Sequence, residues 1–127
     1  MGNRVVKFRG KRVDNGEWVV GYYWSNDLGN HFIRQIIDGE YNYVCTDYEV
    51  DPEIVGQYTG LKDKNGVEIY EGDIYKIEYF GSSRNYLVEW GNFYDGESYQ
   101  GFDVREDGDR CEVIGNIHDN PELLEVK

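Results

Sequence analysis

The stretch that decides the fold of this chain is Gly56-Gln57-Tyr58-Thr59-Gly60-Leu61-Lys62-Asp63-Lys64-Asn65-Gly66-Val67-Glu68-Ile69-Tyr70-Glu71-Gly72-Asp73-Ile74. It contains four glycines and separates two segments rich in strand-forming residues. Asn65-Gly66 is a strong turn signal, because both residues tolerate a positive φ and a type I′ turn matches the twist of paired strands. Glu71-Gly72-Asp73 predicts a second turn, which leads into the apolar run that begins at Ile74. We therefore predict structural turns at Asn65, Gly66, Gly72 and Asp73 that set the register of a β-structure.

The composition also favours short strands. Aromatic residues make up 16% of the 127 residues, and 16 glycines against two prolines suit strands joined by tight turns. Strand-like patterns at residues 5–9, 17–24, 31–37 and 41–45, separated by turn signals, predict an N-terminal β-meander. Because residues 17–24 include few polar positions, we expect that strand to be covered on both faces.

The second half of the chain has the same character. Alternating patterns at 73–79 and 86–90, with shorter ones at 102–104 and 111–117, predict about five strands and suggest a small barrel. Asp51-Pro52 and Asn120-Pro121 each place a capping residue before proline, which predicts two short helical turns. The predicted fold is mainly β: an N-terminal β-meander (residues 1–54) packed on a C-terminal SH3-type small barrel (residues 55–127), with a soft boundary and short helical turns.

The charge balance limits the classes of partner. The chain has 25 Asp and Glu against 13 Lys and Arg, a formal net charge of −12. A surface this acidic repels phosphates, so we expect no direct nucleic-acid binding and a basic protein as partner. The alternative is that the charge serves solubility alone.

The cysteines and the hydropathy indicate a location. Cys45 and Cys111 lie far apart and form no Cys-x-x-Cys pair, so we expect reduced thiols, with a single bridge between them as the alternative. The N-terminus lacks the apolar core of a signal peptide, and no apolar run is long enough to cross a membrane. We therefore expect a cytoplasmic protein with no membrane partner.

Three motifs resemble the YopX family, whose members are small proteins encoded by bacteriophages and prophages. They are Lys7-Phe8-Arg9-Gly10-Lys11-Arg12 at the start, Val50 to Ile74 in the middle, and Val113-Ile114-Gly115-Asn116-Ile117-His118-Asp119-Asn120-Pro121-Glu122-Leu123-Leu124 at the end. The likeness covers nearly the whole chain and is loosest between Trp24 and Tyr48. It implies an SH3-type barrel in the C-terminal half and a bacterial host cell, with a host or phage protein as partner. The family has no established activity, so the resemblance implies no reaction.

No motif predicts a reaction, a cofactor or a metal site. Asp63-Lys64-Asn65-Gly66 resembles the middle of a calcium loop, but Leu61 and Gly72 supply no side-chain oxygen where the first and last ligands belong. His31 and His118 stand in no zinc pattern. The alternating acidic residues Asp47, Glu49, Asp51 and Glu53 suit either a solvated strand edge or a carboxylate-dependent hydrolase.

An aromatic surface is the predicted binding site. Residues 91–101 are polar and aromatic, and we expect them to form a long loop. Flat rings can line a peptide groove, so we predict that Trp90, Phe93, Tyr94 and Tyr99 contact a partner, with burial in the core as the alternative. The leading hypothesis is a non-catalytic phage or prophage accessory protein that binds another protein through an acidic surface. The alternatives are a small carboxylate-dependent hydrolase and a self-associating structural module.

Overall fold

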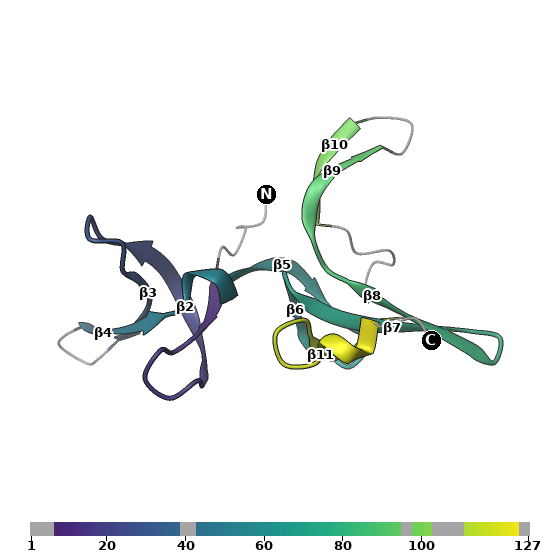
Figure 1. Cartoon of the computed structure of the whole chain (residues 1–127), viewed down its shortest axis with the longest axis horizontal. Helices are drawn as coiled ribbons and strands as arrows, with labels where there is room; N and C mark the ends of the chain where they lie inside the picture. Colours follow the sequence, from purple (N-terminus) through teal and green to yellow (C-terminus); the bar gives the residue numbers. More distant parts are fainter. Residues whose placement is uncertain (1–6, 39–42, 95–97, 103–110, 125–127) are drawn as a thin grey trace. The chain divides into compact units, whose positions relative to one another are not determined.

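The computed structural model describes residues 7–38, 43–94, 98–102 and 111–124 (Figure 1). Contacts between residues divide the chain into two compact units, Met1–Tyr58 and Thr59–Lys127. The described residues form eleven strands and two 3-10 helices, so the prediction of a mainly β protein with short helical turns is confirmed.

The first unit is a meander. Its strands are β1 (Phe8–Lys11), β2 (Trp18–Ser25), β3 (His31–Asp38) and β4 (Tyr43–Val50), followed by the 3-10 helix Pro52–Ile54 and the start of β5 (Gly56–Lys62). The strands lie in the order β4-β3-β2-β1-β5, and each pair of neighbours is antiparallel. Asp51 caps the helix by accepting a hydrogen bond from the Glu53 backbone N–H at 3.0 Å, as predicted.

One face of this meander carries the core of the unit. Ile33 and Val50 are buried on it, and the Phe8 and Tyr23 rings pack with centroids 5.5 Å apart. Gly10 permits this packing, because a Cβ at that position would lie 3.0 Å from the Val50 Cβ. The core of the unit therefore draws on residues spread over four strands.

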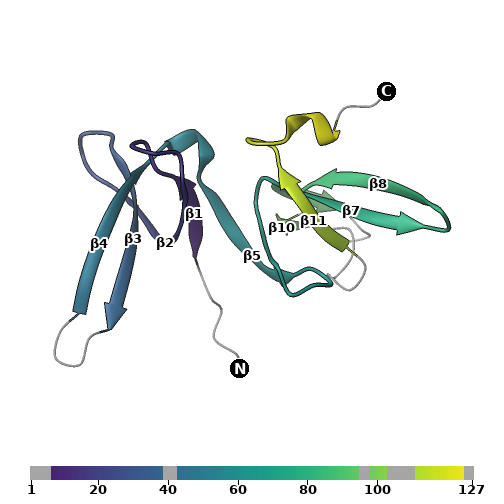
Figure 2. The same cartoon turned by 90° about the horizontal axis from the view of Figure 1, so that it is seen from below.

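The second unit contains β6 (Glu68–Tyr70), β7 (Asp73–Tyr79), β8 (Ser82–Leu87), β9 (Trp90–Tyr94), β10 (Ser98–Phe102), β11 (Cys111–Asn116) and the 3-10 helix Pro121–Leu124. Figure 2 shows the three-stranded sheet β11-β7-β8, and β9 and β10 form a separate hairpin. The buried residues of its core are Ile69, Tyr75, Ile77, Val88 and Cys111. β11 and β8 end this sheet among the described strands, so the SH3-type barrel is not confirmed: no closed barrel is found there.

The turn between β7 and β8 differs from the expected one. We predicted a turn or loop at Gly81-Ser82-Ser83, but Tyr79 pairs with Ser82 and the two-residue loop is Phe80-Gly81. Phe80 has φ 42° and Gly81 has φ 89°, which is the pattern of a type I′ turn. The side chain of Phe80 is fully exposed, so the register of the two strands, and not its own packing, holds it there.

Candidate functional site

The four predicted binding residues lie on a hairpin and not on a loop. Trp90, Phe93 and Tyr94 belong to β9, Tyr99 belongs to β10, and Phe93 pairs with Tyr99 in the ladder. Aromatic residues favour strands, and this preference outweighs the polar residues that made the segment look like a loop. The side chains of these residues lie outside the described part of the structure, so their role in binding stays a prediction.

The first predicted turn, at residues 63–66, depends on Asp63. Its Oδ1 accepts hydrogen bonds from the backbone N–H groups of Asn65 at 2.8 Å and Val67 at 2.9 Å, and its Oδ2 accepts one from Val113 at 2.9 Å. The Gly66 N–H donates to the Asp63 carbonyl, and Gly66 has φ 82°. Lys64 and Asn65 are therefore the central residues of this turn, one position earlier than the type I′ turn that we expected.

The electrostatics of Asp63 fit a structural role. Its side chain is 6% exposed, and burial alone would raise its pKa. The backbone N–H groups of Val113, Val67 and Asn65 outweigh that effect and hold the pKa of Asp63 below its usual value. Three backbone N–H groups use this carboxylate, which therefore stabilises the turn and its contact with β11.

The second predicted turn also has a buried carboxylate. Gly72 has φ 91°, and the Asp73 Oδ2 accepts a hydrogen bond from the Tyr70 N–H at 2.7 Å. The Gly72 carbonyl accepts a hydrogen bond from the Ile117 N–H at 2.8 Å. This turn therefore joins the start of β7 to the segment that follows β11.

The alternating acidic residues Asp47, Glu49 and Asp51 lack the environment of a catalytic pair of carboxylates. Asp47 accepts two hydrogen bonds from the Arg34 guanidinium, at 2.8 and 3.1 Å, and one from the Trp24 indole at 3.0 Å. These bonds, those of Arg34 foremost, hold the pKa of Asp47 below its usual value. A general acid needs the opposite shift. Glu49 accepts a hydrogen bond from the Asn30 amide at 3.0 Å, and Asp51 serves as the helix cap.

The histidines and cysteines, which are the other residues considered for catalysis or metal binding, lie in separate parts of the structure. The Tyr23 hydroxyl is hydrogen-bonded to the His31 Nδ1, whereas His118 lies beside Gly72. Cys45 is exposed, Cys111 is buried in the core of the second unit, and no disulfide joins them. Within the described ranges, no three His, Cys, Asp or Glu side chains lie close enough to hold a metal ion. None of the described helices is long and apolar enough to span a membrane.

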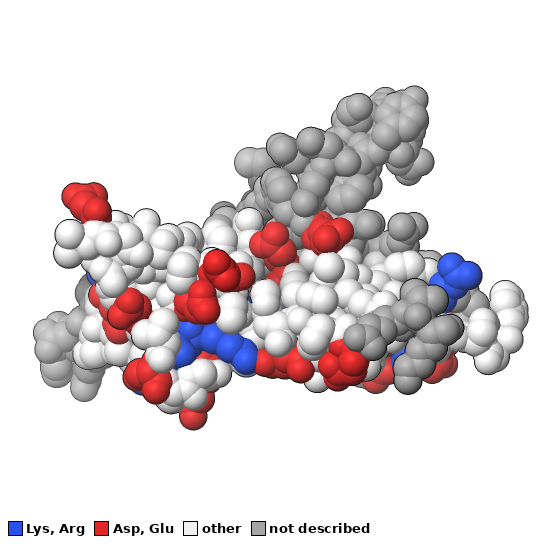
Figure 3. All heavy atoms as spheres, viewed as in Figure 1, with Lys and Arg blue, Asp and Glu red and all other residues white. Residues whose placement is uncertain are grey.

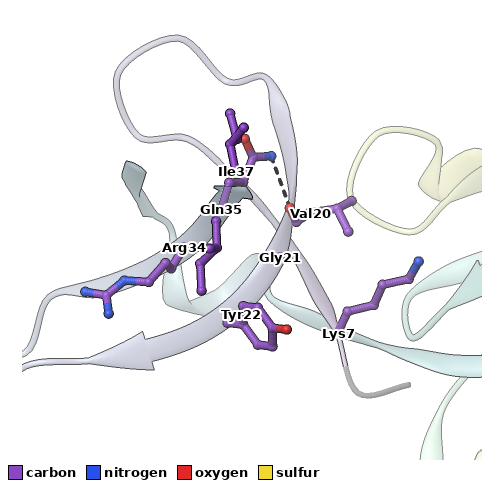
Figure 4. Close-up of a pocket in the computed structure, with 8 residues that line it drawn as sticks. Lys7, Val20, Gly21, Tyr22, Arg34, Gln35 and Ile37 are labelled. Atoms are coloured by element: carbon purple, nitrogen blue, oxygen red, sulfur yellow. Dashed lines mark hydrogen bonds between the residues drawn. The ribbon is translucent and has the colours of Figure 1, made fainter. Parts of the chain in front are cut away.

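The strongest candidate site is a groove in the first unit, which we call the Gly21 groove (Figure 4). It has a volume of about 420 Å³ and is lined by Lys7, Val20, Gly21, Tyr22, Arg34, Gln35, Ile36 and Ile37. Val20, Ile36 and Ile37 are 38%, 49% and 60% exposed. The expectation that this strand is covered on both faces is therefore wrong for β2, because the meander has a single layer at this point and leaves one face open.

Two cations, Lys7 and Arg34, and the ring of Tyr22 line this groove. Lys7 comes just before β1 and alternates with Arg9 and Lys11 of that strand. The Lys7 ammonium lies 4.9 Å from the Tyr58 ring centroid, and the Arg9 guanidinium lies 4.6 Å from the Trp18 ring centroid. Such stacking holds the cations in place on the sheet. Sequence reasoning missed this site, because it forms where β2 passes from one neighbouring strand to another.

These features define a small, mainly β protein of two units, one of which has an open groove in its sheet. The model of the family described as YopX protein matches residues 7–125, and the chain belongs to the YopX family. The crystal structure of protein EF1440 from Enterococcus faecalis is similar, with 29% sequence identity and a TM-score of 0.56. That match covers 97% of this chain and 100% of the other. A comparison with the curated proteins finds no match.

Proposed function

We propose that this YopX family protein is a non-catalytic phage or prophage accessory protein that binds another protein, and that the Gly21 groove is its contact surface. The observation that carries the proposal is the exposure of Val20, Ile36 and Ile37 around a single hollow. Aliphatic side chains grouped in this way lose contact with water when a partner covers them. The aromatic hairpin β9–β10 is a second contact surface in this proposal.

The net charge of the molecule contributes separately to partner binding, and it acts over a longer range than the contacts in the groove. A net charge of −12 attracts basic proteins and speeds their encounter, and salt screens this attraction. On the face shown in Figure 3, the Asp and Glu side chains lie in several groups with Lys and Arg among them. Steering therefore acts through the net charge, whereas the groove provides the specific contact.

The test is affinity capture from a bacterial lysate at low and high salt. The immobilised wild-type protein is compared with the variant V20S/I36S and with the control L28S, which removes an exposed leucine outside the groove. We expect the wild type and L28S to retain the same partner, V20S/I36S to lose it, and high salt to slow its capture. Equal recovery by V20S/I36S would show that the groove is not the contact surface.

A further inference from the structure

Two exposed turns of this protein contain the dipeptide Asn-Gly, at Asn15-Gly16 and at Asn65-Gly66. An asparagine followed by glycine can react with its own backbone. The glycine nitrogen, after losing its proton to hydroxide, attacks the side-chain Cγ, and the Cγ–Nδ2 bond breaks to release ammonia, which takes a proton from water. Water then opens the resulting succinimide ring to aspartate or isoaspartate. Glycine favours this attack because it has no Cβ to crowd the ring.

The turn at Asn15 binds the reacting side chain. The Asn15 Oδ1 accepts a hydrogen bond from the Glu17 backbone N–H at 3.0 Å. The ring that this bond closes contains both the Asn15 Cγ and the Gly16 nitrogen, so the two reacting atoms stay close together. Negative charge develops on the Oδ1 during the attack, and a donor already placed at such an oxygen stabilises the transition state. Because this hydrogen bond ends on the reacting side chain, it follows that side chain as the succinimide ring closes.

The turn at Asn65 binds the backbone instead. The Asp63 Oδ1 accepts hydrogen bonds from the N–H of Asn65 at 2.8 Å and of Val67 at 2.9 Å, one on each side of the Asn65-Gly66 peptide bond. The Gly66 N–H donates to the Asp63 carbonyl, so Asn65 is the third residue of a β-turn, where ψ is about 0°. Closing a succinimide ring rotates the backbone away from this value. At Asn65 the rotation breaks a hydrogen bond to a buried carboxylate, which is stronger than a neutral one.

Asn116 provides an internal comparison. Its Oδ1 accepts a hydrogen bond from the His118 N–H at 3.0 Å, so its side chain is bound in the same way as that of Asn15. The residue that follows it is Ile117, whose branched side chain crowds a planar ring and whose N–H donates to the Gly72 carbonyl at 2.8 Å. Among the three asparagines compared, Asn15 therefore combines a bound side-chain carbonyl with a following glycine.

We propose that Asn15 is a site of self-modification in the folded protein, where succinimide formation converts it to aspartate and isoaspartate, and that Asp63 protects Asn65 from the same reaction. This inference does not depend on the proposed function, because the reaction needs only the chain, hydroxide and water. Both products carry a carboxylate, so the modified turn gains one negative charge. Isoaspartate also adds a carbon to the backbone between Arg12 and Glu17, whose N–H and carbonyl pair at 2.9 Å, and so loosens the turn between β1 and β2.

The test is incubation of the folded protein at mildly alkaline pH, followed by digestion and mass spectrometry. Trypsin releases residues 13–34 and 65–76 as separate peptides, so the two Asn-Gly steps are followed one by one. Digestion in heavy-oxygen water marks any conversion that occurs during the digest, and chromatography separates the aspartate and isoaspartate forms. We expect Asn15 to convert about ten-fold faster than Asn65, which corresponds to the difference between losing a neutral and a charge-assisted hydrogen bond.

The same incubation in urea is the reference. Unfolding removes both turns, so Asn15 and Asn65 should then convert at similar rates. Asn116, in the peptide of residues 111–127, should remain unconverted in the folded protein. Equal rates at Asn15 and Asn65 in the folded protein would overturn the inference, and so would conversion of Asn15 that occurs only in urea.

Substitutions at Asp63 test the protection separately. D63A should raise the rate at Asn65 about ten-fold and leave the rate at Asn15 unchanged, because it removes the acceptor of both N–H groups. D63N retains a neutral acceptor and should raise the rate at Asn65 by less. The matched control D51A, which removes the cap of the 3-10 helix in the first unit, should change neither rate. Circular dichroism checks that each variant folds, and D63N decides the matter if D63A does not. A rate at Asn65 that these variants leave unchanged would overturn the role of Asp63.

Discussion

The contribution of Asp63 to stability can be worked out from its hydrogen bonds. In D63N the amide oxygen can still accept from Asn65 and Val67, but the amide NH₂ faces the N–H of Val113, so that bond is lost. Hydrogen bonds to a charged group contribute about 1.5–3 kcal/mol and neutral ones about 0.5–1.5 kcal/mol. The neutral amide avoids the desolvation cost of the buried charge, and this offsets part of the free energy lost with the hydrogen bonds. We expect D63N to lower the free energy of unfolding by about 2–4 kcal/mol at neutral pH.

The effect of D63N should depend on pH in one direction. The pKa of Asp63 is lowered in the folded protein, below the value of about 3.9 for an unfolded aspartate. A lowered pKa stabilises the folded state above the unfolded value, and that stabilisation is lost as the pH falls through the folded pKa. The difference between the wild type and D63N should therefore be constant above about pH 5 and shrink below about pH 4.

The assay is urea unfolding followed by circular dichroism, repeated across pH, with amide exchange to assign the loss to residues 59–127. The control is D14N, which removes an exposed carboxylate paired with Arg12 at 2.6 Å. That change should cost less than about 1 kcal/mol, as exposed ion pairs do. The reasoning is refuted if D63N costs no more than D14N, or if the cost of D63N persists unchanged at acid pH.

Three further predictions concern the backbone. F80N should raise the free energy of unfolding by about 0.5–1 kcal/mol, because Asn tolerates the positive φ at this exposed turn position better than Phe does; a lower melting temperature would contradict it. G66V should lower the free energy of unfolding by more than about 1 kcal/mol, because Gly66 has φ 82°, and an unchanged urea midpoint would show that the turn tolerates a side chain. G21A should lower it by at least about 1 kcal/mol, since its Cβ meets the Arg34 carbonyl, and wild-type stability in the same titration would count against that close approach.

Local features of this protein could be predicted from the sequence. The cap at Asp51-Pro52 and the mainly β character depend on residues close together in the chain, whose backbone preferences act over a few bonds. The family motifs led to the YopX family for the same reason, because they are continuous stretches of sequence. The turn at Asn65-Gly66 was located only to within one residue, since the type of turn depends on the hydrogen bonds of Asp63.

Contacts between distant residues were decided by the tertiary structure alone. Asp63 binds the N–H of Val113, 50 residues away, and no local preference indicates that bond. Phe80 takes a left-handed conformation against its own preference because the ladder between β7 and β8 requires a two-residue turn. The Gly21 groove exists because β2 exchanges one neighbour for another, and such an exchange depends on how whole strands pair. Strand pairing and burial are properties of the assembled sheet, which is why the sequence determined the class of fold and the structure decided where a groove forms in it.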